Sequence, residues 1–170
     1  EGITLDKAST LTQNQRNDLI YNIMKLLFAE IFDFKLIQTD PNFSNFLYQK
    51  KGNKIVLLDF GATQKITPNL SKKFRTLLRA TWRNDEVDIK TALTDLNILD
   101  ASLPSHFEKI FMEIFLDATR PIREKKIFDF REIRIIEKIQ NHAQEIISYQ
   151  KKIKIPEMAT LLIQRKVGGL

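Results

Sequence analysis

The chain has 170 residues, of which 27 are Lys or Arg and 21 are Asp or Glu, so its formal net charge is +6. A hydrophobic share of 43% with a charged share of 28% is typical of a folded domain and excludes a disordered chain. The chain has no Cys, only two His, and five Gly that match no phosphate-binding loop motif. These absences exclude disulfide scaffolds, thiolate metal sites and P-loop or dinucleotide-binding sites. The sequence contains no run of about 18 apolar residues, so it predicts no transmembrane helix.

A length of 170 residues corresponds to one domain or to part of a larger one. The chain begins at Glu1 without an initiator Met, and no signal or transit peptide precedes the folded pattern. We therefore expect an excised segment whose C-terminus is also truncated.

The first element predicted along the chain is an amphipathic helix over about residues 13–34. Thr12 and Gln15 have the spacing of a capping box, in which a hydroxyl and an amide satisfy free backbone donors. Apolar residues then recur at three- and four-residue steps. The following segment, residues 36–45, is polar and rich in turn formers, which predicts a loop.

A small β-hairpin is predicted next. Residues 46–48 and 54–58 are short runs of β-forming residues, and residues 50–53, Lys-Lys-Gly-Asn, form the turn between them. After the second strand only helices are predicted, starting at Pro68, near residue 85, at Pro104 with a Ser105–Glu108 capping box, over 130–149, and at Pro156. Trp82 falls on the helical period of the first of these and is expected in the core. The predicted fold class is α+β, mostly helical.

The polar loop and the hairpin carry a pattern of chemical interest. Asp40 precedes Asn45 by five positions, and Asp59-Phe60-Gly61 follows the second strand directly. Each piece alone is common in proteins, and Asp40 with Asn45 could simply close a turn. Together they follow the order of a kinase catalytic loop, D-x-x-x-x-N, two short strands and D-F-G.

Phosphoryl transfer explains why these residue types would be needed. The reaction depends on positioning and on neutralising the charge of the triphosphate, and Mg²⁺ prefers oxygen ligands. The carboxylate of Asp59 and the amide oxygen of Asn45 are suitable metal ligands. Asp40 is placed to accept a proton from, or to orient, an attacking hydroxyl or water. Gly61 would allow a sharp backbone turn, and the ring of Phe60 is expected to pack and fix that turn.

The segments Leu36–Phe46 and Leu57–Thr63 resemble the UbiB (AarF-domain) family of atypical kinase-like proteins, in particular the mitochondrial members of coenzyme Q biosynthesis. Gln38-Thr39-Asp40 stands where ordinary protein kinases have His-Arg-Asp. The termini are also similar to the family, so the resemblance spans nearly the whole chain.

The resemblance implies that residues 1–170 form the C-terminal lobe of a kinase-like domain whose N-terminal lobe is absent. It implies binding of ATP and Mg²⁺, with Asp40 as the catalytic acid and with Asn45 and Asp59 as metal ligands. Cofactor contacts are expected from Asn45, Asp59, Phe60 and Gly61. It further implies ATPase-like activity in support of a coenzyme Q biosynthesis complex, on the matrix side of the mitochondrial inner membrane. We expect the fragment alone to be inactive.

Other interpretations stay open. The chain could be a catalytically silent helical scaffold or a membrane-associated module, because acidic residues are missing between Asp59 and Asp85 while basic residues are frequent there. These basic residues could form a solvated face or attract anionic lipid. No nucleic-acid-binding module is recognisable, so nucleic acid is not an expected partner. A small-molecule kinase of the aminoglycoside or choline type shares D-x-x-x-x-N, but Asp59-Phe60-Gly61 disfavours it. The excess of basic residues as a whole is spread over Lys50, Lys51, Lys54, Lys65, Lys72, Lys73, Arg75, Arg79 and Arg83.

Overall fold

The computed structural model describes residues 2–40, 42–124, 126–129, 137, 140–141 and 156–169. The chain divides into two compact units, one of Glu1–Ser71 with Met158–Leu170 and one of Lys72–Glu157. Helices predominate and the strands are short, which confirms the predicted α+β, mostly helical class.

The longest helix of the first unit, α1, spans Gln13–Ala29 and continues into a π-helical turn, η2, at Glu30–Phe34. Thr12 accepts the Gln15 N–H, and the Gln15 side chain accepts the Thr12 N–H, which confirms the predicted capping box. Lys35 then adopts a left-handed conformation with φ of 52° and reverses the chain. Sequence periodicity therefore predicted this element correctly through residue 34.

A three-stranded antiparallel sheet contains the predicted hairpin. Strand β3 (Phe46–Gln49) pairs with β4 (Lys54–Leu57), with Phe46 opposite Leu57. Gly52 has φ of 92° in the turn, a conformation that glycine tolerates because it lacks a Cβ. The other edge of β3 pairs with β1 (Ile3–Thr4), which the sequence pattern did not predict and which is followed by the 3₁₀ helix η1 (Leu5–Thr10).

The second sheet corrects two sequence predictions. Leu36–Gln38, expected to be loop, forms strand β2, and Thr63–Lys65, in a region expected to be all helical, forms β5. The two strands pair antiparallel, with Gln38 opposite Thr63. Strands of three residues carry almost no periodic signal, so only the encounter of two distant segments identifies them. A 3₁₀ turn, η3 (Phe43–Asn45), leads from the loop into β3.

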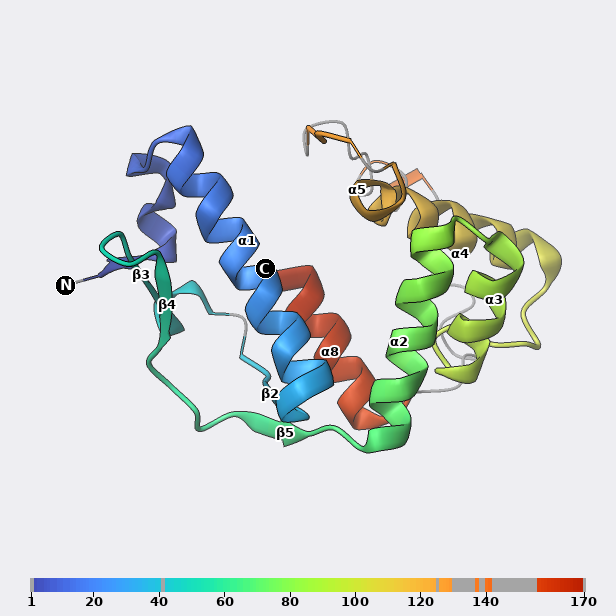
Figure 1. The fold of residues 1–170 in the computed structure, drawn as a ribbon. Helices are drawn as coiled ribbons and strands as arrows, with labels where there is room; N and C mark the ends of the chain where they lie inside the picture. Colours follow the sequence, from blue (N-terminus) through green and yellow to red (C-terminus); the bar gives the residue numbers. More distant parts are fainter. Residues whose placement is uncertain are drawn as a thin grey trace. The chain divides into compact units, whose positions relative to one another are not determined.

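The core of the first unit lies where α1, the sheets and the C-terminal helix meet. Phe46 and Ile37 are fully buried there, together with Leu19 and Leu27 of α1. Helix α8 (Met158–Gly169) runs beside α1 (Figure 1), and Ile163 on α8 is 1% exposed. This confirms the helix predicted to begin near Pro156. The predicted helix over 130–149 falls largely outside the described residues and stays a prediction.

The second unit is built from helices. Two predictions fail there. Trp82, expected in the core, is 54% exposed, while Leu77, Ala80 and Thr81 of the same helix are buried. The Ser105–Glu108 capping box does not form, because Pro104 occupies the N-cap and its side chain accepts no hydrogen bond. The helices with described bounds in this unit are α2 (Pro68–Arg83, its first turn in the first unit), α3 (Glu86–Asp95), α4 (Ser105–Ala118) and α5 (Arg120–Arg123).

Within the described ranges, no helix combines the length and the apolar character needed to cross a bilayer.

Candidate functional site

Asp40 and Asn45 lie in the loop between β2 and β3, and their side chains touch. The amide Nδ2 of Asn45 donates to Oδ2 of Asp40 at 2.8 Å, and the backbone N–H of Asn42 donates to Oδ1 of Asp40 at 3.3 Å. Both Asp40 and Asn45 are half-buried. Pro41, between them, lies outside the described residues. The loop therefore brings the two side chains together and fixes which way the Asn45 amide faces.

Asp59, Phe60 and Gly61 form a turn directly after β4. Oδ1 of Asp59 accepts the backbone N–H of Gly61 at 2.7 Å, and a Cβ at position 61 would lie only 3.2 Å from that oxygen. Glycine therefore suits this turn because of the close approach of Asp59. Phe60 is 61% exposed, so the expectation that its ring packs to fix the turn is wrong. The Asp59–Gly61 hydrogen bond closes the turn instead.

Backbone hydrogen bonds tie the two loops together at both ends. At one end, the N–H and the hydroxyl of Thr39 donate to the carbonyl of Ala62 at 2.7 and 3.1 Å. At the other end, the N–H of Leu58 donates to the carbonyl of Asn45 at 2.9 Å. The flanking pairs β2–β5 and β3–β4 extend both connections. The loop with Asp40 and the turn with Asp59 thus form one connected structure, which β2 and β5 help to build.

The oxygen atoms of this site are of the chemical kind that hard divalent cations bind. Because Nδ2 of Asn45 is engaged by Asp40, Oδ1 of Asn45 remains as an acceptor, and it makes no hydrogen bond to another described residue. The same holds for Oδ2 of Asp59, whose Oδ1 is engaged by Gly61. Neither Asp40 nor Asp59 pairs with a Lys, Arg or His of the described part of the chain. Carboxylate and amide oxygens without a cationic partner are the ligands that Mg²⁺ prefers.

Among the described residues, no group of three or more His, Cys, Asp and Glu side chains could hold a metal ion. The predicted set of Asn45 and Asp59 differs in kind, since it combines one amide with one carboxylate and relies on further ligands from phosphate and water.

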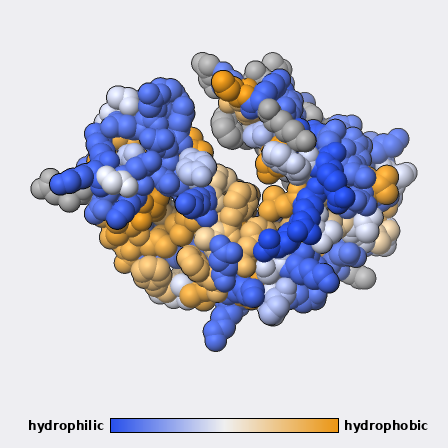
Figure 2. Space-filling model, viewed as in Figure 1, coloured by the Kyte–Doolittle hydropathy of each residue, from blue (hydrophilic) through white to orange (hydrophobic). Residues whose placement is uncertain are grey.

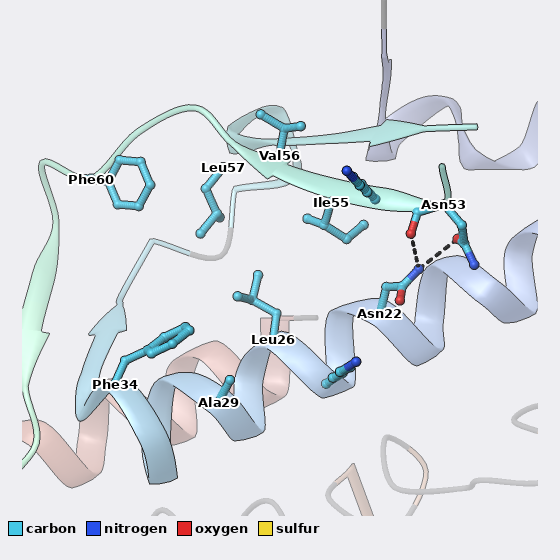
Figure 3. Close-up of a pocket in the computed structure, with 11 residues that line it drawn as sticks. Asn22, Leu26, Ala29, Phe34, Asn53, Ile55, Val56, Leu57 and Phe60 are labelled. Carbon is cyan, nitrogen blue, oxygen red and sulfur yellow. Dashed lines mark hydrogen bonds between the residues drawn. The ribbon is translucent and has the colours of Figure 1, made fainter. Parts of the chain in front are cut away.

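An apolar groove of about 600 Å³ adjoins the Asp59–Gly61 turn. It runs between α1 and β4, and Ile55 and Leu57 point toward Leu26 on the helix, with Phe60 at one end (Figure 3). Asn22 donates to the carbonyl and the side-chain oxygen of Asn53 at the other end. Apolar surface is visible on the hairpin and on the adjoining part of α1 (Figure 2). Phe60 thus lies exposed at the end of an apolar groove.

A basic stripe, defined here as Lys72, Arg75 and Arg79, lies along α2. These side chains recur at three- and four-residue steps, so they share one face of the helix, and all three residues are exposed. Lys73 is different, because it is half-buried and its Nζ donates to the carbonyl of Asp95 at 2.6 Å. The stripe is therefore narrower than the sequence suggested.

Sequence reasoning missed one buried polar pair next to the site, Glu30 with Lys166. The signal was present, because Glu30 follows Ile23 and Leu27 on the apolar face of the first helix, and Lys166 follows Ile163 by three positions. A charged residue on an apolar helical period indicates a buried partner.

Comparisons with known proteins agree with the motif order. A model of the ABC1 atypical kinase-like domain matches residues 1–93, which include both loops of the site. "Atypical kinase COQ8B, mitochondrial" of Danio rerio is 29% identical over 168 residues, 99% of this chain and 27% of that protein. "Atypical kinase COQ8, mitochondrial" of Saccharomyces cerevisiae is 29% identical over 172 residues, 100% of this chain and 34% of that protein.

The protein with that same description from Schizosaccharomyces pombe is 32% identical over 164 residues, 96% of this chain and 25% of that protein. The chain thus spans about a quarter to a third of the length of these curated relatives. The family match extends over more than half of the 170 residues and includes the residues that carried the resemblance. The chain belongs to the ABC1 atypical kinase-like family, as its motifs predicted.

Proposed function

We propose that this chain forms the catalytic-loop half of an Mg²⁺-ATP site in an atypical kinase or ATPase. The observation that carries the proposal is the connection of the two loops, with Asn45 oriented by Asp40 and backed by the Leu58 hydrogen bond. The N-terminal lobe implied by the family resemblance would supply the rest of the site, so we expect the chain by itself to be inactive.

In this proposal Asn45 and Asp59 hold the metal ion through Oδ1 and Oδ2, the oxygens that no described residue engages. The bound Mg²⁺ would supply charge neutralisation for the triphosphate. Asp40 has two roles. Its carboxylate fixes the Asn45 amide, and it orients or deprotonates the attacking hydroxyl or water. Gly61 permits the tight turn at Asp59, and Phe60 contributes an apolar contact beside the nucleotide.

We also propose that the full-length protein supports coenzyme Q biosynthesis as part of a complex, on the matrix side of the mitochondrial inner membrane. The support is the family membership and the names of the relatives, which are mitochondrial atypical kinases.

The test uses the full-length protein that contains this chain. We expect Asp59→Asn and Asn45→Ala to abolish metal-dependent ATP binding or turnover, because each removes one oxygen ligand or its charge. Binding is measured by titrating ATP at several Mg²⁺ concentrations. Matched controls are Asp33→Asn and Asn69→Ala, which change exposed residues of the same types elsewhere. Wild-type affinity and turnover in both site variants would refute the proposal.

A second candidate function is a membrane-associated scaffold, and the basic stripe on α2 favours it. Each basic residue near an anionic bilayer contributes roughly 1 kcal/mol of attraction. Reversal of the stripe (Lys72, Arg75 and Arg79 to Glu) is then expected to abolish flotation with anionic liposomes, whereas reversal of Lys50 and Lys51 in the hairpin turn leaves it intact. Equal flotation of the stripe variant and the wild type would rule out this electrostatic attachment.

A further inference from the structure

A buried ion pair joins the C-terminal helix to the end of α1. The ammonium Nζ of Lys166 on α8 lies 2.5 Å from Oε2 of Glu30, and the two side chains are 1% and 4% exposed. Lys and Glu are almost never fully buried without a partner, so this arrangement is a specific feature of the fold. It connects residues 136 positions apart in the chain.

The pair also contacts both flanks of the loop that carries Asp40 and Asn45. On one flank, Oε1 of Glu30 accepts the backbone N–H of Gln38 at 3.3 Å, two residues before Asp40. On the other flank, Nζ of Lys166 lies 5.8 Å from the ring centroid of Phe46, the residue directly after Asn45. A cation over an aromatic face is attracted by the ring quadrupole. One ion pair thus contacts Gln38 and Phe46, which lie at the two ends of the loop.

The side chain of Gln38 adds no hydrogen bond to a described residue at this start of the loop. The Gln38 side chain is buried, yet neither its Nε2 nor its Oε1 has a hydrogen-bond partner among the described residues. The position of the segment therefore depends on its strand pairing, on the hydrogen bonds from Thr39 to Ala62 and on the Glu30 acceptor. A buried charge can serve as an acceptor in this place only while Lys166 compensates it.

We propose that Glu30 and Lys166 are positioning residues, which hold Asp40 and Asn45 in register for metal and nucleotide. The inference rests on the proposed function of the loop and adds to it a dependence on α8, which lies outside the matched family region. Lys166 acts through Glu30 and Phe46, and Glu30 acts through the Gln38 N–H.

The first measurement concerns the loop itself, without metal or nucleotide. Hydrogen–deuterium exchange of the full-length protein is followed in peptides that cover residues 36–46. We expect Lys166→Met to cause loss of protection there, because the unpaired Glu30 carboxylate no longer stays at the Gln38 N–H. Glu30→Gln is expected to lose less, since its amide oxygen can still accept that N–H.

The second measurement is the Mg²⁺ concentration that half-saturates ATP binding. Removing a direct partner of a metal ligand weakens metal affinity by roughly 10–100-fold. Lys166 lies further out, because it acts through Glu30 and Phe46, so we expect Lys166→Met to raise this concentration by about tenfold at most. A variant that is only less stable would lose active protein without changing the Mg²⁺ dependence. The double variant Glu30→Gln/Lys166→Met, which buries no unpaired charge, is expected to show a smaller increase, and it replaces the single variant if that one does not fold.

Two controls separate positioning from general packing. Ile163→Ala weakens the packing of α8 but keeps the ion pair, and Lys90→Met breaks an exposed pair elsewhere; both should retain the wild-type Mg²⁺ dependence. The inference fails if the folded Lys166 variant, single or double, keeps the wild-type Mg²⁺ dependence and loop protection. It also fails if Ile163→Ala changes them equally. If Asp59→Asn leaves Mg²⁺-dependent binding intact, the proposed function itself fails, which is a separate result.

Discussion

Two ion pairs of this chain have almost the same length and very different surroundings. Lys166 and Glu30, in the first unit, lie 2.5 Å apart with side chains 1% and 4% exposed. Lys90 of α3 and Glu108 of α4, in the second unit, lie 2.6 Å apart with side chains 49% and 29% exposed. Water screens the second pair and is excluded from the first. The N–O distance alone therefore does not tell how much an ion pair contributes to stability. The loss of one partner costs most where water cannot solvate the charge that remains.

The largest expected effect comes from breaking the buried pair. Lys166→Met leaves the Glu30 carboxylate buried and unpaired, so we expect the free energy of unfolding to fall by about 3–5 kcal/mol. Urea denaturation followed by circular dichroism measures this value. A loss as small as that of a surface substitution would contradict the buried state of the pair.

The exposed pair serves as the matched control. Lys90→Met removes the same kind of side chain at nearly the same N–O distance. Because both partners stay hydrated after the change, we expect a loss of only about 0.2–1 kcal/mol. If the two variants lost the same stability, the contrast drawn from burial would be wrong.

A smaller effect concerns pH. Burial lowers the pKa of Lys166 from its usual value of 10.5, and the hydrogen bond and the charge of Glu30 oppose this shift in part. The folded protein therefore holds this proton less tightly than the unfolded chain does. Between the lowered pKa and 10.5 the unfolded chain binds more protons, so the contribution of Lys166 to stability rises with pH in that window.

The measurement compares the free energy of unfolding of the wild type with that of Lys166→Met. We expect the free energy of unfolding of the wild type to increase relative to that of the variant as the pH is raised from neutral toward 10.5. A change in favour of the variant over this range would contradict the direction of the pKa shift.

The long helices and the hairpin could be predicted because their signals are local. The capping box at Thr12 and the apolar period after it correctly located α1, and the Gly52 turn correctly located the hairpin. The strands β2 and β5 could not be found in this way, since each has three residues and is stabilised only by the other. Trp82 shows a further limit, because a helical period identifies a face but not whether another element covers it.

The candidate site was predictable as a motif but not as an arrangement. Asp40, Asn45 and Asp59 stood out through their spacing and through the oxygen chemistry they share. That Asp40 orients the amide of Asn45, and that Thr39 binds the carbonyl of Ala62, became visible only in the fold. The roles assigned to these residues remain predictions that the variants above test.

The sequence by itself determined the residue types of the site and the local elements around it, because caps, turns and helical periods depend on neighbours within a few positions. The tertiary structure decided which distant segments support that site. The pairing of Lys166 with Glu30 and the joining of β2 to β5 depend on burial and on backbone hydrogen bonds between segments far apart in the chain. No local pattern encodes such contacts, since their energy arises only when folding removes water from both partners.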